Sequence, residues 1–252
     1  MVAEAASNIN DPAGIPELFS YANYYAILIG EKDYEDPGFN DLESPAKDVS
    51  DLKKILTKYY QFIDKEVKTL INSPRVNILD SITAKAESMK DDDNLIIFYA
   101  GHGDVKKLGT KILGGYIILS DAKKNSRGTY ISSEDLKSSI EGSEAKHILF
   151  VVDACLGGAL FRGTMDEAPQ NIKNLYNQKS RKMITRGNME EVPDNGSFIQ
   201  RLKDYLTNNT QKYFSAYDLF TTLFKTADIS TPQYEAISGI GDMDGQFIFV
   251  KK

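Results

Sequence analysis

The chain has 252 residues, of which 41% are hydrophobic and 26% are charged, and its formal net charge is −6. This length can bury a sizeable core, as one large domain or two intimate subdomains. The negative charge argues against a general nucleic-acid binder, which would carry a basic face. It is compatible with a site that receives a cationic substrate.

The chain holds a single cysteine, Cys155, so it can form no intrachain disulfide. A free thiol is typical of a reducing compartment, and we expect a cytoplasmic protein. No segment approaches the ~18 apolar residues of a membrane span, so we expect no membrane association. Residues 1–20 lack the basic and apolar segments of a signal peptide and are expected to form a polar, partly disordered leader.

The first half of the chain alternates short apolar runs with longer helical patterns. Tyr25–Ile29 is an apolar run closed by Gly30, which is typical of a buried strand. From Ala46 onward, apolar residues recur at helical spacing with charges between them, and the same pattern returns after Pro74. Residues 31–45 are polar and predict a loop. The sequence therefore predicts strands over residues 25–29, 68–71 and 95–100, and helices over residues 46–60 and 76–89.

The second half continues this alternation but contains an irregular region. Ser132 and Asp135 form a capping-box-like pair ahead of a helical pattern, as do Ser215 and Asp218. Residues 159–182 carry several basic side chains and few apolar ones, which predicts a long basic loop. The sequence further predicts strands over residues 115–119 and 147–153, from 183, and over 247–250, and helices over residues 132–140 and 197–206 and from 215.

Strands that alternate with helices predict an α/β fold with a mostly parallel sheet covered on both faces. In such sheets, ligands bind beyond the carboxyl ends of the strands. Two of the predicted strands end in chemically reactive residues. One leads into Gly101-His102-Gly103, and the other leads through Asp153 and Ala154 to Cys155.

Cys155 and His102 together suggest a nucleophile and its base. The thiolate is the reactive form of cysteine, and a nearby histidine can take the thiol proton and later protonate a leaving amine. The other histidine, His147, precedes Cys155 on the same predicted strand and would lie roughly 26 Å from the thiol. We therefore assign His102 as the base. Backbone N–H groups near Gly103 and Cys155 are candidates for an oxyanion hole.

Each of these residues alone has a plainer interpretation. A lone cysteine in an apolar strand is more often a packing residue, and a lone His-Gly pair is more often a turn. Their joint occurrence at two strand ends favours the catalytic interpretation. A phosphate or nucleotide binder that uses the turn at Gly101–Gly103 is a further alternative, but the chain has no Walker-type or GxGxxG motif.

The two motifs also carry a family resemblance. Tyr99-Ala100-Gly101-His102-Gly103 precedes Asp153-Ala154-Cys155-Leu156-Gly157, with 53 residues between the histidine and the cysteine. A caspase signature combines an Ala-Cys-x-Gly motif with a histidine ~50 residues upstream. The chain resembles the caspase-like cysteine peptidases, specifically the bacterial members related to metacaspases and orthocaspases. The resemblance implies a three-layer α/β sandwich and a Cys155–His102 dyad.

The resemblance also implies an internal division of the chain. Residues 21–160 resemble the large-subunit part of the family and residues 183–252 its small-subunit part, with the basic loop of residues 161–182 between them. A peptidase specific for basic residues would be able to cut itself in that loop, between Arg162 and Lys182. Many bacterial relatives act in stress, cell-death or defence pathways, and nothing in the sequence chooses among these.

Asp153 is the expected determinant of substrate choice. Residues two apart on a strand point the same way, so Asp153 should face the side that Cys155 faces. A carboxylate there attracts an arginine or lysine side chain of a protein or peptide substrate. Caspases have glutamine at this position and accept aspartate, whereas metacaspases have aspartate and accept arginine or lysine. The alternative is that Asp153 caps a backbone turn beside the cysteine.

Further acids are expected to assist Asp153. Asp194 lies in a Pro-Asp-Asn-Gly segment that the family places near the pocket, and Glu190 and Glu191 are rivals for this role. Asp48 matches an aspartate near the metacaspase site, or is a charge favoured at a helix N-terminus. We expect no cofactor, because no calcium loop is evident, although family analogy allows activation by Ca²⁺ and by a regulatory protein.

The leading prediction is thus a cysteine endopeptidase that cleaves after arginine or lysine. The alternative is a catalytically silent caspase-like scaffold that binds partners.

Overall fold

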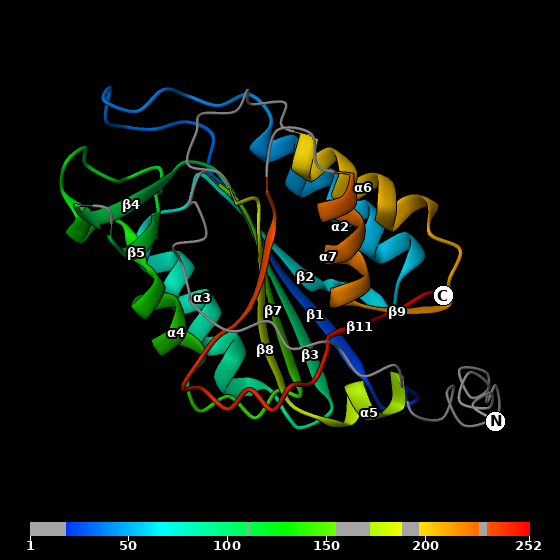
Figure 1. Cartoon of the computed structure of the whole chain (residues 1–252). Coiled ribbons are helices and arrows are strands. Elements are labelled where there is room, and N and C mark those ends of the chain that lie inside the picture. Colours follow the sequence, from blue (N-terminus) through cyan, green and yellow to red (C-terminus); the bar gives the residue numbers. More distant parts are fainter. Residues whose placement is uncertain (1–18, 110, 155–171, 188–196, 227–230) are drawn as a thin grey trace.

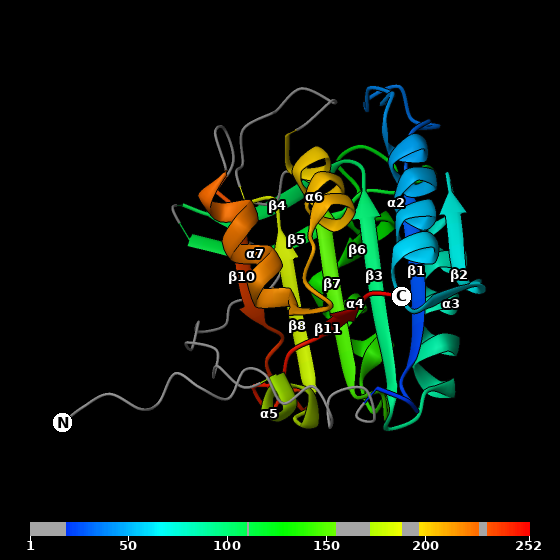
Figure 2. The same ribbon diagram turned by 90° about the vertical axis from the view of Figure 1, so that its right-hand side faces the viewer.

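The computed structural model describes residues 19–109, 111–154, 172–187, 197–226 and 231–252. A six-stranded sheet forms its centre, in the order β10-β8-β7-β3-β1-β2. Five strands run parallel, and β10 runs antiparallel to β8 at one edge (Figure 2). From edge to edge, the strands are β10 (Gln233–Ala236), β8 (Ser180–Thr185), β7 (His147–Asp153), β3 (Asp93–Ala100), β1 (Asn23–Gly30) and β2 (Phe62–Ile71).

Helices cover both faces of the sheet, which confirms the predicted three-layer α/β fold (Figure 1). Apolar residues of the central strands alternate between the two faces. On β1, Leu28 packs with one helical layer, and Ile27 and Ile29 pack with the other. The first layer holds α2 (Pro45–Tyr59), α6 (Ser197–Asn208) and α7 (Ala216–Lys225), and the second holds α3 (Arg75–Ser88) and α4 (Ser133–Ile140).

Two of the helices begin with the capping boxes that the sequence predicts. Ser132 accepts a hydrogen bond from the backbone N–H of Asp135, and the Asp135 carboxylate accepts one from the backbone N–H of Ser132. Ser215 and Asp218 form the same reciprocal pair at the start of α7. Each box satisfies two backbone donors at a helix end, which fixes where the helix starts.

A three-stranded antiparallel ribbon follows β3 and contains β4, which the sequence analysis missed. The ribbon pairs β4 with β5 and β5 with β6. The side chains of β4 are only partly buried or exposed, so they lack the apolar run that marks a central strand. The strands are β4 (Gly103–Leu108), β5 (Lys111–Ile117) and β6 (Ile131–Ser132), the last two being separated by a short 3₁₀ helix over Arg127–Thr129.

The predicted basic loop over residues 161–182 is wrong in its second half. Residues 172–177 form the helix α5 (Ile172–Asn177), and β8 begins at Ser180. Arg181 and Lys182 are buried rather than looped out, because each meets acceptors inside the fold. The Arg181 guanidinium donates to backbone carbonyls of Ser143, Ala145, Lys146 and Ser180, and the Lys182 ammonium pairs with Asp242 and Asp244.

Two strand predictions need adjustment. β2 begins at Phe62, six residues before the predicted start. It lies at an edge of the sheet, and its side chains between Phe62 and Val67 are exposed or partly buried, so this part lacks the apolar run of a central strand. The predicted closing strand exists as β11 (Ile248–Val250), but it pairs with β9 (Tyr213–Ser215) in a separate two-stranded sheet. The predicted leader of residues 1–20 lies almost wholly outside the described residues.

Candidate active site

The carboxyl edge of the sheet brings the two candidate motifs to neighbouring strands. β3 and β7 are adjacent and parallel, and Ala100 is in register with Asp153. The backbone N–H of Gly101 donates to the Asp153 carbonyl at 3.4 Å, just beyond the last register pair. His102 therefore follows one strand end, and the segment toward Cys155 follows the other. Cys155 itself lies outside the described residues, and the residue before it, Ala154, is buried.

The imidazole of His102 is oriented by a backbone carbonyl. Its Nε2 lies 2.7 Å from the carbonyl oxygen of Asn40, in the loop between β1 and α2. A carbonyl oxygen can only accept, so Nε2 carries the proton in this hydrogen bond. In the neutral ring, Nδ1 is then the acceptor and is able to take a proton from a thiol. The rings of Tyr34 and Phe39 lie 4.9 and 6.2 Å from the imidazole centroid.

The main chain of His102 is held from both sides. Its N–H donates to the Tyr34 hydroxyl at 3.0 Å. Its carbonyl lies 2.7 Å from the Tyr99 hydroxyl and accepts from the backbone N–H of Ile118 at 3.0 Å. Two tyrosines and the ribbon thus fix the backbone of the histidine, and Asn40 fixes its ring.

This arrangement requires a glycine at position 101, because the neighbouring side chains leave no room there for a Cβ atom. A Cβ at position 101 would lie 2.5 Å from the Tyr99 hydroxyl oxygen and 3.1 Å from the Cβ of Glu31. Close approach of the Tyr99 hydroxyl is therefore the reason for a glycine at this position.

Glu31 ties together the loops around this edge. Its buried carboxylate accepts hydrogen bonds from the backbone N–H of Ser73 at 3.0 Å and of Ser120 at 2.7 Å. These residues follow β2 and β5, so one side chain links two loops to the end of β1. Burial raises the pKa of Glu31 to about 7, although the two N–H donors oppose that rise.

Asp153 is buried in an ion pair with Arg186. The guanidinium Nη1 lies 3.1 Å from the Asp153 carboxylate, and both side chains are less than a tenth exposed. Arg186 directly follows β8, the next strand along the sheet, and its N–H donates to the carbonyl of Val152 at 3.1 Å. The predicted substrate-binding acid thus has an internal cationic partner.

Asp48 is also in a buried ion pair. It lies in the first turn of α2, and the Lys203 ammonium of α6 approaches its carboxylate to 2.8 Å. Asp194, Glu190 and Glu191, the other predicted acids, lie outside the described residues. Gly103, predicted for the oxyanion hole, begins β4 and is in register with Ile117 of β5.

His147 lies at the opposite, amino end of β7. Its ring nitrogens are 2.7 Å from Asn94 Oδ1 and 3.1 Å from the Gln178 carbonyl oxygen, and the residue is fully buried. Burial lowers the pKa of His147 to about 3, and the Gln178 carbonyl opposes this only in part. A histidine enclosed in this way is a structural group, which agrees with its exclusion as the base.

A model of the caspase domain matches residues 23–236 of this chain. The chain belongs to the caspase-domain family. No curated protein matches this chain significantly.

Solved structures agree with this caspase fold. Caspase-1 from Spodoptera frugiperda is 16% identical, with a TM-score of 0.59 over 86% of this chain and 88% of that one. A protein from Geobacter sulfurreducens is also 16% identical, with a TM-score of 0.61 over 89% of this chain and 99% of that one. At these identities the likeness extends to the fold.

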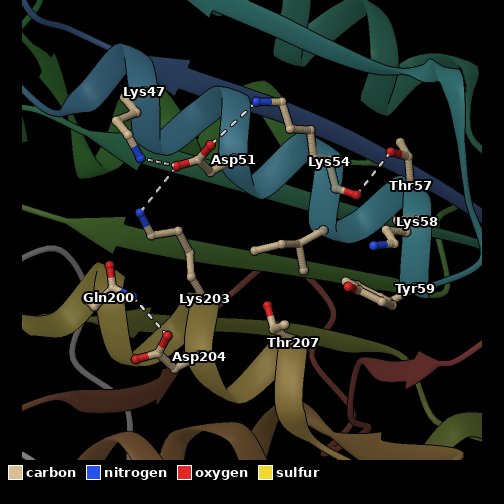
Figure 3. Close-up of a pocket in the computed structure, with 11 residues that line it drawn as sticks. Lys47, Asp51, Lys54, Thr57, Lys58, Tyr59, Gln200, Lys203, Asp204 and Thr207 are labelled. Atoms are coloured by element: carbon tan, nitrogen blue, oxygen red, sulfur yellow. Dashed lines mark hydrogen bonds and ion pairs between the residues drawn. The ribbon is translucent and has the colours of Figure 1, made fainter.

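A cleft of about 720 Å³ lies between α2 and α6, apart from the candidate active site at the carboxyl edge of the sheet. Neither His102 nor Asp153 lines it. Its basic residues include Lys47, Lys54 and Lys203, and Figure 3 shows all three reaching toward one carboxylate, that of Asp51. These three ammonium groups are thus engaged with a carboxylate of the same cleft.

Sequence reasoning missed several residues that shape the site. Asn40 contributes only a backbone carbonyl, so its side chain carries no signal. Arg186 was not singled out, although it follows the strand predicted from Met183. Tyr34 and Glu31 fell in a segment interpreted as a polar loop, and only their burial in the structure shows their role.

Over the described residues, no group of three or more His, Cys, Asp and Glu side chains is arranged to hold a metal ion. Within the same ranges, no helix has both the length and the apolar character needed to cross a membrane.

Proposed function

We propose that this caspase domain is a cysteine endopeptidase that cleaves after arginine or lysine. The observation that carries the proposal is the environment of His102, at the carboxyl edge of the sheet. Its Nε2 is committed to the Asn40 carbonyl, and its Nδ1 is left as the proton acceptor. A base with this orientation next to the strand that leads to Cys155 is what a thiol nucleophile requires.

The proposed reaction has two halves. His102 Nδ1 takes the thiol proton of Cys155, and the thiolate attacks the scissile carbonyl carbon. Backbone N–H groups of Gly103 and Cys155 receive the negative charge on the carbonyl oxygen. The C–N bond then breaks as His102 returns its proton to the leaving amine. Water, activated by the same imidazole, hydrolyses the thioester and restores the thiol.

Asp153 is the proposed contact for the basic side chain of the substrate. It lies at the sheet edge where ligands of parallel sheets bind, two residues before Cys155. Asp194, or one of Glu190 and Glu191, is proposed to assist it. Asp48 is proposed as a further acid of the substrate site, with the Lys203 ammonium 2.8 Å from its carboxylate.

Fluorogenic peptides test this function. The wild-type protein should cleave peptides ending in arginine or lysine, and should leave a matched aspartyl peptide intact. Cys155→Ala should abolish turnover. Assays with and without Ca²⁺ and with EDTA decide whether the ion activates. Absence of turnover under all these conditions would favour a partner-binding scaffold, the alternative function.

Self-processing in the basic segment is a further part of the proposal. Arg181 and Lys182 are buried in β8, so cleavage after either would require local unfolding. Lys173 is exposed on α5 and is the better site among the described residues. Mass spectrometry of the wild-type protein against Cys155→Ala should find new termini after Lys173, Lys179 or Arg162. Only intact chain in the active enzyme would show that cleavage is unnecessary.

The pathway is proposed to be bacterial stress, cell death or defence. A neighbouring gene for a pore-former or a sensor would choose among these.

A further inference from the structure

The Arg186 guanidinium pairs with the Asp153 carboxylate, which is the group proposed to bind the basic side chain of the substrate. Asp153 ends β7 and Arg186 follows β8, so the pair bridges the carboxyl ends of two adjacent strands. The Nη1–Oδ1 distance is 3.1 Å. Both side chains are buried, and water screens their attraction little.

Charge balance limits what else this carboxylate can bind. The Arg186 guanidinium lies 3.1 Å from this carboxylate. A second buried cation that the substrate brought to the same carboxylate would lie beside the Arg186 guanidinium, and two like charges close together in a poorly solvated site repel each other strongly. A basic substrate side chain must therefore displace the Arg186 guanidinium or bind weakly.

The backbone around Arg186 confines such a displacement to the side chain. The Arg186 N–H is bonded to the Val152 carbonyl. At the next residue, Gly187, φ is +99°, and a Cβ there would lie 1.7 Å from the Thr231 carbonyl oxygen. The main chain is thus packed closely, whereas the arginine side chain has several rotatable bonds.

We propose that Arg186 determines specificity by competing with the basic side chain of the substrate for the Asp153 carboxylate. This inference rests on the proposed function. It makes the wild-type enzyme selective for substrates that bind tightly enough, through their other residues, to displace the internal guanidinium. Peptides that offer little besides a single arginine are poor ligands of the wild-type protein.

A second buried pair on the same strand provides a matched control. Lys182 pairs with Asp242 at 2.8 Å, and both side chains are about as buried as those of Asp153 and Arg186. Lys182 lies toward the middle of β8 rather than at its carboxyl end. Loss of the Lys182 ammonium costs an ion pair of the same kind without exposing Asp153.

Binding is measured in the Cys155→Ala protein, so that the result does not depend on turnover. Isothermal titration calorimetry compares a short peptide ending in argininamide with the same peptide ending in norleucinamide. Adding Arg186→Ser should tighten binding of the arginine peptide at least tenfold and change that of the norleucine peptide less than threefold. Adding Lys182→Ser should change neither by more than threefold.

Unchanged or weaker binding of the arginine peptide by the folded Arg186→Ser protein would overturn the inference. Circular dichroism establishes folding. If Arg186→Ser does not fold, Arg186→Lys replaces it. Lysine keeps the charge but loses the planar fork of donors, so a gain of about threefold is expected, and no gain overturns the inference. Failure of the wild-type protein to cleave any peptide would count against the proposed function alone.

Discussion

The carboxyl edge of the central sheet, where its parallel strands end, and the amino edge, where they begin, carry the same kinds of residues in different environments. Each edge has a histidine and a buried arginine, namely His102 and Arg186 at the carboxyl edge and His147 and Arg181 at the amino edge. At the amino edge, the histidine is fully enclosed and the arginine donates to four carbonyls. At the carboxyl edge, the histidine is only partly buried and its Nδ1 is available.

This difference shows that residue type alone does not mark a functional site. The amino edge is sealed by internal hydrogen bonds, so its polar groups stabilise the fold. The carboxyl edge keeps a polarised imidazole and a paired acid next to the strand that leads to Cys155. If the two edges act independently, a substitution at one edge should leave the properties of the other unchanged.

The largest expected effect is on activity. His102→Ala should lower kcat/KM for an arginyl peptide by 10²- to 10⁴-fold, because general-base catalysis is lost. His147→Gln should leave kcat/KM of the folded protein within about threefold of wild type while lowering its melting temperature. A comparable loss of activity in both folded variants would mean that the two edges do not differ in function.

The pH dependence of stability should have opposite signs at the two edges. Glu31 has a folded-state pKa of about 7, above its unfolded value of 4.5. Its stabilising contribution to the free energy of unfolding is therefore fully present below pH 4.5 and is lost as pH rises to 7. This change amounts to roughly 3 kcal/mol. His147 has a folded-state pKa of about 3, so it destabilises the fold as pH falls below 6.5.

Urea unfolding at several pH values measures both slopes. Glu31→Gln should remove the loss between pH 4.5 and 7, and His147→Gln should remove the loss below pH 6.5. Each variant is the control for the other. If the free energy of unfolding of a variant still changes with pH as in the wild type, the substituted group is not the source of that pH dependence.

Removing the buried arginine of the amino edge should affect stability alone. Arg181→Met leaves several buried carbonyls without their donor, which should cost roughly 2 to 3 kcal/mol of unfolding free energy. Peptide cleavage by the folded protein should not change in its preference for arginine over norleucine. A changed preference would connect this edge to substrate recognition.

The smallest expected effect is at Tyr34, whose hydroxyl accepts a hydrogen bond from the main chain of His102. Tyr34→Phe removes the hydroxyl that accepts from the His102 N–H, at a cost of about 1 kcal/mol. Because this hydroxyl acts through His102, kcat should fall several-fold with KM nearly unchanged. An increase in KM alone would indicate that Tyr34 contacts the substrate instead.

Much of the fold could be predicted from local patterns. The central strands β1, β3 and β7 are continuous apolar runs because both of their faces are buried, and the capping boxes at Ser132 and Ser215 specify helix starts directly. The start of β8 was missed because Arg181 and Lys182 resemble a solvated segment. Their partners, such as Asp242, are ~60 residues away in the chain, and no local pattern reveals them.

Part of the arrangement around the candidate site could also be predicted. The position of His102 at a strand end, and the distance of His147 from that end, follow from strand geometry. The ion pair of Asp153 with Arg186 does not, because it depends on which strand neighbours β7. The pairing of Asp48 with Lys203 spans 155 residues and depends on the packing of α2 against α6.

The close approach of Gly101 to Tyr99 has an evolutionary consequence. A Cβ at position 101 would meet the Tyr99 hydroxyl oxygen at 2.5 Å. Homologues that replace the glycine by alanine should therefore also lack that hydroxyl, with phenylalanine or a smaller residue at position 99. These two positions should covary even though only the glycine lies next to His102 in sequence.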